Sequence, residues 1–190
     1  MLDEKMMEYI LEVEGGYVHH PADRGGETKY GITRKTLENA FKRRIVTHVN
    51  VKDLTPEEAN AIYYKMYYVP SEGEWIEENF GKKLALIHLD TAINSGVRVA
   101  EKFFQRTINY IAGDEVLKVD GFIGPITKRV SQKILSDDVK IRFACVTYLW
   151  LRAKYYTDIV NRNHTQRVFL LGWLNRLEKL EKYLEKLNGR

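Results

Sequence analysis

Cysteine, proline and long apolar runs are all scarce in this sequence. Its 190 residues include one cysteine, Cys145, and four prolines. One cysteine excludes an internal disulfide and any zinc or redox site built on a Cys-x-x-Cys pair. No apolar run approaches the roughly 18 residues of a membrane-spanning helix. The acidic start, Met-Leu-Asp-Glu, differs from a secretory signal. We therefore expect a soluble globular protein that is made in the cytoplasm.

Charge of one sign is also not concentrated anywhere. Thirty Lys and Arg against 26 Asp and Glu give a net charge of +4, and the basic residues are interleaved with acidic ones along the chain. A dedicated nucleic-acid-binding protein would show a clustered basic stripe. We expect no nucleic-acid partner, because mixed charges of this kind are typical of a solvated surface.

Helical periodicity is present almost everywhere, so the sequence predicts a mainly α fold. The expected helix starts are Thr33, the capping box of Thr55 and Glu58, Gly124-Pro125 and Asp137, and the expected helix ends are Gly15, Gly96 and Gly113. The expected helices cover residues 2–14, 34–41, 56–69, 84–95, 103–112, 137–156 and 168–187, and a further short helix is expected to open at Gly124-Pro125. Residues 15–32 are expected to form a glycine-rich loop or small hairpin, and residues 45–51 are the best remaining strand candidate. A composition shift near residue 81 suggests regions 1–80 and 81–190, packed as one compact unit.

The first loop carries the strongest chemical signal. Glu14 ends an amphipathic helix and is followed directly by Gly15-Gly16-Tyr17. A carboxyl group there lies at the negative end of the helix macrodipole, and partial burial would add to that effect and raise its pKa. A protonated carboxyl group is what a glycosidase uses to protonate a leaving glycosidic oxygen. Asp23 or Thr28 could hold the attacking water. The alternative is that Glu14 lies on the surface and that the glycines only form turns.

Other candidates are weaker. His19 and His20 precede Asp23, but no third or fourth ligand accompanies them, so no metal site is expected. Cys145 lies among apolar residues, which favours a buried structural thiol over a nucleophile. We expect Tyr17 and Tyr30 to line a sugar-binding groove, because an aromatic ring with a polar tip suits a partly wet cleft.

The segment from Glu14 to Thr33 (EGGYVHHPADRGGETKYGIT) resembles the signature of glycoside hydrolase family 108, a lysozyme-like group of bacterial and phage N-acetylmuramidases. The resemblance implies that Glu14 is the catalytic acid, in a lysozyme-like helical domain whose hairpin or glycine-rich loop lies near the active site. One departure concerns Thr28. Similar phage lysozymes place a threonine six residues after the aspartate, whereas Thr28 follows Asp23 by five.

The second half resembles the small peptidoglycan-binding domain that follows in this family. Residues 89–96 (LDTAINSG) and 119–127 (VDGFIGPIT) carry that resemblance. Asp90 and Asn94 have the polar side chains that a muropeptide needs, as do Asp120 and Thr127. A structural role is an equally good interpretation for Asp120, in a turn with Gly121, and for Thr127, in the first turn of a helix.

The resemblance implies an endolysin-type enzyme that hydrolyses the β-1,4 bond between N-acetylmuramic acid and N-acetylglucosamine, without cofactor or metal. The alternatives are a lytic transglycosylase and a non-catalytic peptidoglycan-binding or secretion-assisting protein. The expected partner is the glycan strand of peptidoglycan, and the expected form is a monomer. The enzyme would reach the wall, in the periplasm, through a holin or another export route. The C-terminal amphipathic helix should dock on the domain, with outer-membrane contact as the minority interpretation.

Overall fold

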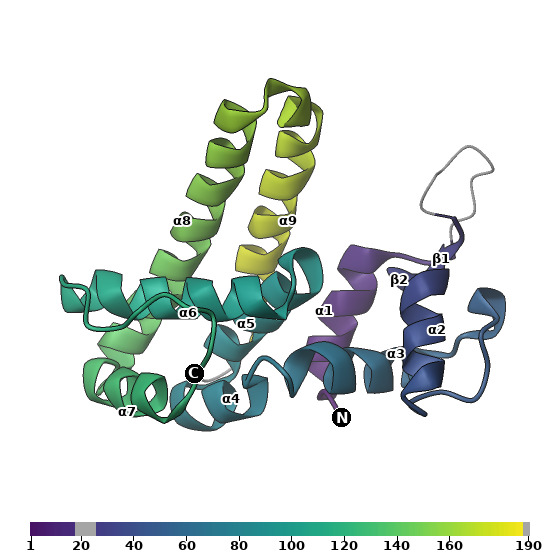
Figure 1. Cartoon of the computed structure of the whole chain (residues 1–190), viewed down its shortest axis with the longest axis horizontal. Coiled ribbons are helices and arrows are strands. Elements are labelled where there is room, and N and C mark those ends of the chain that lie inside the picture. Colours follow the sequence, from purple (N-terminus) through teal and green to yellow (C-terminus); the bar gives the residue numbers. More distant parts are fainter. Residues whose placement is uncertain (18–25, 188–190) are drawn as a thin grey trace. The chain divides into compact units, whose positions relative to one another are not determined.

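The computed structural model describes residues 1–17 and 26–187 and confirms the mainly α fold (Figure 1). In these two ranges the chain forms nine α-helices and one two-stranded antiparallel sheet. It divides into two compact units, Met1–Pro70 and Ser71–Arg190, which we call unit 1 and unit 2. The division follows Pro70, whereas the composition shift had pointed to residue 81.

Unit 1 begins with a helix, a hairpin and a second helix, and ends in a helix that changes its winding. Its elements are α1 (Glu4–Glu14), β1 (Thr28–Lys29), β2 (Ile32–Thr33), α2 (Arg34–Lys42), the 3-10 helix η1 (Val51–Asp53), α3 (Pro56–Tyr63) and the π-helix η2 (Tyr64–Tyr68). The expected capping residues are confirmed. The side chain of Thr33 accepts from the Thr36 N–H, and Thr55 and Glu58 form a capping box.

The small hairpin expected in the first loop is present, but the strand considered at residues 45–51 is not. Thr28 pairs with Thr33 and Lys29 with Ile32 in the hairpin. Residues 45–50 have no regular structure, and Val51 starts η1 instead. The β-branched residues there have no neighbouring strand among the described residues, so propensity alone does not make a strand.

The core of unit 1 is built from one face of each helix. Met6, Tyr9 and Ile10 of α1 are almost completely buried, as are Leu37 of α2 and Ile62 of α3. Asn60 joins the first residues to α3, because its amide accepts from the Leu2 N–H at 2.9 Å and donates to the Leu2 carbonyl at 3.1 Å. These contacts anchor α1 in the core of unit 1 from its N-terminal end to its middle.

Unit 2 is a helical assembly ending in a long antiparallel hairpin (Figure 1). Its elements are α4 (Gly73–Phe80), α5 (Lys82–Ser95), α6 (Val97–Ala112), α7 (Pro125–Ile134), α8 (Asp138–Arg162), the 3-10 helix η3 (His164–Gln166) and α9 (Arg167–Lys186). The sequence prediction missed α4. This helix follows Glu72 in a left-handed conformation (φ 63°) and has no side-chain cap, so the usual start signal is absent.

Helix α5 is the centre of unit 2. Every residue from Leu84 to Ala92 is buried, including the polar His88, Asp90 and Thr91. A helix buried on all sides needs a polar network for such groups. His88 has one: its Nε2 lies 2.8 Å from the Ser71 carbonyl and its Nδ1 lies 3.1 Å from the Tyr148 hydroxyl.

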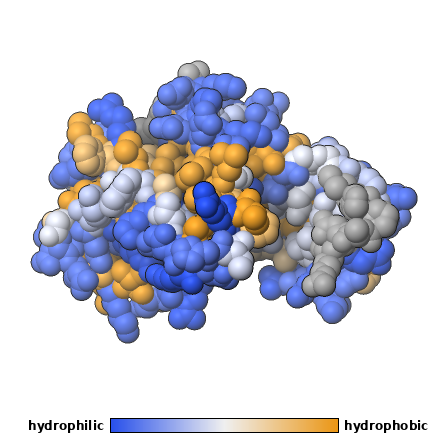
Figure 2. All heavy atoms as spheres, turned by 90° about the horizontal axis from the view of Figure 1, so that it is seen from above, coloured by the Kyte–Doolittle hydropathy of each residue, from blue (hydrophilic) through white to orange (hydrophobic). Residues whose placement is uncertain are grey.

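Helix α9 docks on unit 2 through the apolar face that the sequence identified. Leu177, Leu180, Leu184 and Leu187 are all buried, so in this structure that face is covered by protein and is not free to contact a membrane. Among the described residues no helix is long and apolar enough to cross a bilayer. The apolar residues that remain exposed lie nearer the start of α9 and along α8, including Val168 and Leu171. Figure 2 shows hydrophobic residues gathered over the α8–α9 hairpin.

Candidate active site

Glu14 lies at the C-terminal end of α1, as expected. It is the last helical residue, and it is half-buried. The helix ends there because Gly15 adopts a φ of 76°, a conformation that favours glycine, while its N–H donates to the Leu11 carbonyl. Because the rest of α1 is anchored in the core, the backbone of Glu14 is held in place, while its half-buried side chain remains partly accessible to solvent.

Gly31 provides the space in which the Glu14 carboxyl group rests. A Cβ atom on Gly31 would lie 2.8 Å from both Cβ and Cδ of Glu14 and still closer to its Oε2. Real Cβ atoms do not approach other heavy atoms this closely, so only glycine fits here. The φ of Gly31, +72°, favours glycine independently. The hairpin turn therefore packs its backbone against the acid.

The turn that contains Gly31 is held from the other side by α3. Tyr30 precedes Gly31 and also has a positive φ, 53°. Its carbonyl accepts a hydrogen bond from the Tyr63 hydroxyl at 2.5 Å. Lys29 secures the same hairpin by donating to the Lys52 carbonyl at 2.6 Å. Two unusual backbone conformations are thus stabilised directly beside Glu14, which is typical of functional sites.

Tyr67 is a site residue that the sequence did not single out. It lies in η2, and π-helical turns occur frequently at functional sites. Burial raises the pKa of its phenol, a hydrogen bond with Thr36 lowers it, and the nearby charge of Glu14 raises it further. Tyr67 therefore lies close to Glu14. The change from α to π winding was the missing information, because it alters which tyrosines of residues 63–68 share a face.

Glu27 provides a second carboxyl group in the described part of the loop. The Tyr17 hydroxyl donates to its Oε2 at 3.2 Å, and Arg34 Nη2 lies 2.9 Å from its Oε1. Tyr17 is 39% exposed and so retains surface for a ligand. The Glu27 carboxylate is therefore held by both Tyr17 and Arg34.

The other predicted residues of unit 1 divide into two groups. Thr28 is half-buried on β1, and Tyr30 occupies the hairpin turn, so both belong to the hairpin that packs against Glu14. Asp23, like His19 and His20, lies outside the described residues. The roles assigned to Glu14, Asp23, Thr28, Tyr17 and Tyr30 remain predictions.

Asp90 and Asn94 lie in unit 2, where they belong to a polar network that joins three helices. Both oxygens of Asp90 are ion-paired: Arg152 Nη2 lies 2.8 Å from Oδ2 and Arg176 Nη2 lies 2.8 Å from Oδ1. Tyr156 extends the network, since it accepts from Arg152 at 3.1 Å and donates to Asn94 at 3.0 Å.

This arrangement gives Asp90 a structural role. The carboxyl group has no exposed surface, so in this conformation a glycan cannot touch it. Burial alone would raise the pKa of Asp90, but the guanidinium groups of Arg152 and Arg176 outweigh burial and lower it. Asn94, in contrast, is exposed and remains a candidate for ligand contact.

Asp120 and Thr127 also act within the fold. Asp120 Oδ1 accepts from the Gln105 amide at 2.8 Å and from the Phe122 N–H at 3.1 Å, and the Thr127 hydroxyl donates to the Phe122 carbonyl. The loop before α7 is therefore braced against α6, as the turn interpretation implied. No group of three or more His, Cys, Asp and Glu side chains suited to a metal ion occurs in residues 1–17 and 26–187.

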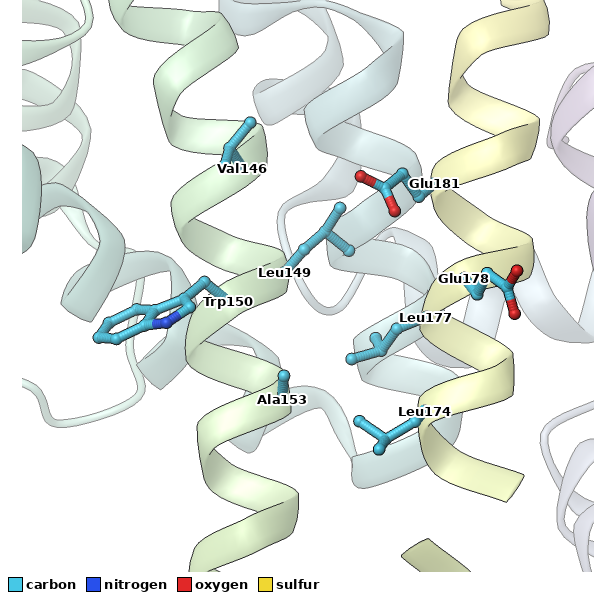
Figure 3. Close-up of a pocket in the computed structure, with 8 residues that line it drawn as sticks. All are labelled: Val146, Leu149, Trp150, Ala153, Leu174, Leu177, Glu178 and Glu181. Atoms are coloured by element: carbon cyan, nitrogen blue, oxygen red, sulfur yellow. The ribbon is translucent and has the colours of Figure 1, made fainter. Parts of the chain in front are cut away.

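An apolar groove of about 370 Å³ lies between α8 and α9. In Figure 3, Leu149, Leu174 and Leu177 point into the space between these helices, whereas Trp150 and Glu178 point away from it. Sugar-binding sites need several convergent polar groups. Of the two carboxylates that line this groove, only Glu181 points toward it, so the groove is a poor candidate for a glycan site.

The fold and the site together define a class. A helical protein in which a half-buried carboxyl group rests against a glycine turn, among Tyr17, Tyr30 and Tyr67, has the features of a lysozyme-like glycoside hydrolase.

The comparisons with known proteins identify the family. Residues 7–96 match the model of glycosyl hydrolase 108, and residues 99–178 match that of a predicted peptidoglycan domain. The chain belongs to glycosyl hydrolase family 108, with a peptidoglycan domain after its hydrolase region. It is thus a glycoside hydrolase that acts on peptidoglycan.

One similar solved structure is SagA of Brucella abortus. It is 28% identical to this chain, with a TM-score of 0.68, and the match covers 98% of this chain and 95% of SagA. Among curated proteins, none matches this chain significantly.

Proposed function

We propose that the chain is an N-acetylmuramidase that hydrolyses the β-1,4 bond between N-acetylmuramic acid and N-acetylglucosamine, with Glu14 as the general acid. The observation that carries this proposal is the packing of the Glu14 carboxyl group against Gly31, beside Tyr67. A general acid must be held in one place and must remain accessible. The end of α1 meets both requirements, because the helix is anchored and Glu14 is only half-buried.

In the proposed reaction, Glu14 donates its proton to the glycosidic oxygen as the bond to the anomeric carbon breaks. A water molecule attacks that carbon, and its oxygen forms the new bond. Asp23, with Thr28, is the proposed acceptor of the water's proton. With one strongly indicated acid and no established nucleophile, inversion is the favoured stereochemical course.

The aromatic side chains around Glu14 support a sugar substrate. Tyr17 and Tyr30 lie in the same loop and hairpin, and each has a lysine ammonium group near its ring, at 5.8 Å for Lys52 over Tyr17 and 5.5 Å for Lys29 over Tyr30. Rings with polar tips provide stacking surface and hydrogen bonds at once. In this proposal they bind the glycan strand, and the chain acts at the cell wall.

Mass spectrometry of the products from purified peptidoglycan tests the reaction type. Hydrolysis adds one water to each broken bond and leaves a reducing N-acetylmuramic acid at the new end. A lytic transglycosylase would instead close a 1,6-anhydro ring without adding water. Reducing ends on N-acetylmuramic acid support the proposal, whereas anhydro products, or reducing ends on N-acetylglucosamine, would overturn it.

A further inference from the structure

Two adjoining hollows run along α6 in unit 2. The first, about 320 Å³, lies between α6 and α8, and the second, about 710 Å³, lies between α6 and the loop that follows it. Arg106 and Leu151 line both. The hollows therefore adjoin at these two side chains, and we treat them together as one groove. All of the residues that line it fall within residues 99–178, the part that matches the peptidoglycan domain.

The first hollow carries a net positive charge and is lined by the aromatic rings of Phe103 and Tyr155. Lys154 is paired with Asp158 at 2.8 Å, which leaves Arg106 and Arg162 as the excess cations. Within the described part of the chain, neither of these guanidinium groups forms an ion pair, and both side chains are exposed. Arg106 lies over the ring of Phe103, at 5.7 Å from its centroid, so its position is partly fixed. Exposed guanidinium groups without an ion-pair partner suit carboxylates.

The second hollow is lined by two carboxylates of the loop that follows α6, and hydrogen bonds hold this loop to the helix. Asp114 and Glu115 are exposed and line it together with Tyr110. The loop cannot move freely away from α6, because the Asn109 amide donates to the Leu117 carbonyl at 2.7 Å and accepts from the Leu117 N–H at 2.8 Å. Exposed carboxylates at a fixed position suit a primary ammonium group.

We propose that this groove binds the peptide stem of peptidoglycan, with the stem's carboxylates at Arg106 and Arg162 and the free ammonium group of its diamino acid at Asp114 and Glu115. The inference rests on the proposed function in one respect, since peptidoglycan is the shared ligand. The charge distribution carries the assignment: a glycan strand without peptide has no ammonium group for the acidic end.

The first test measures the affinity of the full chain for a purified disaccharide–tetrapeptide that contains a diamino acid. The double variant Arg106→Gln, Arg162→Gln should weaken binding at least about tenfold, because each change removes hydrogen bonds to a charged group. Arg142→Gln is the matched control, since Arg142 is an exposed arginine on α8 that lines neither hollow. Binding of peptide-free glycan chains should be the same for all three proteins. Equal affinity of the double variant and wild type for the tetrapeptide ligand would overturn the proposal.

A second test addresses the acidic end. Acetylation of the ligand's free amine should weaken binding to wild type, and the variant Asp114→Asn, Glu115→Gln should bind the acetylated and unmodified ligands equally well. If acetylation has no effect on wild type, or if duplex DNA and anionic lipid vesicles compete as well as the muropeptide, the groove is a general charged surface and the proposal fails.

The two proposals fail separately. A wild-type protein that binds the tetrapeptide ligand through this groove but releases no reducing sugar from peptidoglycan would contradict the muramidase proposal alone. A protein that cleaves glycan strands but binds peptide-free and peptide-bearing fragments equally would contradict the groove assignment alone.

Discussion

Gly31→Ala is the substitution that most directly disturbs the geometry around Glu14. The new Cβ would lie 2.8 Å from Cβ and Cδ of Glu14, so either the hairpin or the carboxyl group must shift. Alanine at a φ of +72° costs about 1–2 kcal/mol in backbone conformation. Relief of the steric overlap costs a further 1–3 kcal/mol or so, by analogy with overpacked cores. We expect unit 1 to lose about 2–5 kcal/mol of stability.

Gly26→Ala provides the matched control. Gly26 has the same φ, +72°, but a Cβ there meets no described atom within 4 Å. This variant should therefore lose only the backbone contribution, and the difference between the two variants isolates the contact with Glu14.

Activity should respond more strongly than stability to Gly31→Ala. Displacement of a catalytic group by about 1 Å can lower the rate about a hundredfold. Urea unfolding followed by circular dichroism, together with release of reducing sugar from purified peptidoglycan below the unfolding transition, measures both effects. If folded Gly31→Ala protein cleaves peptidoglycan as fast as Gly26→Ala protein, the contact does not position the acid, and the reasoning is refuted.

Two further predictions concern the polar core of unit 2. Asp90→Asn should destabilise the chain by about 3–5 kcal/mol, because it leaves the buried Arg152 and the half-buried Arg176 without their counter-ion; a stability within 1 kcal/mol of wild type in urea unfolding would contradict this. Burial lowers the pKa of His88 from 6.5 to about 4, so between these values the unfolded chain binds a proton that the folded chain does not. Stability should therefore fall by about 2 kcal/mol between pH 7 and pH 5, and in His88→Gln that pH dependence should be smaller by about this amount.

Much of the fold follows from local signals in the sequence. Thr33, Thr55 and Asp137 cap helices as expected, and Gly96 and Gly113 end them. These signals act within one helical turn, so a single sequence displays them. Helix α4 was missed because it has no capping side chain and is also short, with only Gly73, Ile76 and Phe80 buried, so it shows little apolar periodicity. The π-helix η2 was missed because helical periodicity does not distinguish π from α winding over five residues.

The candidate site was predictable in part, for the same reason. Glu14 and its glycines are contiguous, so the sequence indicates an acid at a helix end. The contact with Gly31 and the proximity of Tyr67 depend on how the hairpin and η2 fold back on α1, and periodicity does not encode that. Asp90 shows that residue type alone can also suggest a ligand contact where the structure has none. Its residue type suits a ligand contact, but its role depends on arginines far along the chain, Arg152 and Arg176.

The central claim is that Glu14 is the acid of a peptidoglycan-cleaving enzyme, and a comparison of Glu14→Gln with Glu12→Gln tests it most directly. Glu12 is an exposed glutamate on the same helix, so both variants remove one carboxyl group from α1. The rate of turbidity loss of chloroform-treated Gram-negative cells should fall by a factor of about 100 or more in Glu14→Gln and remain at the wild-type rate in Glu12→Gln. A folded Glu14→Gln protein that lyses cells at the wild-type rate would contradict the assignment of the acid. If the wild-type protein binds purified sacculi but does not cleave them, this result would contradict the muramidase proposal itself.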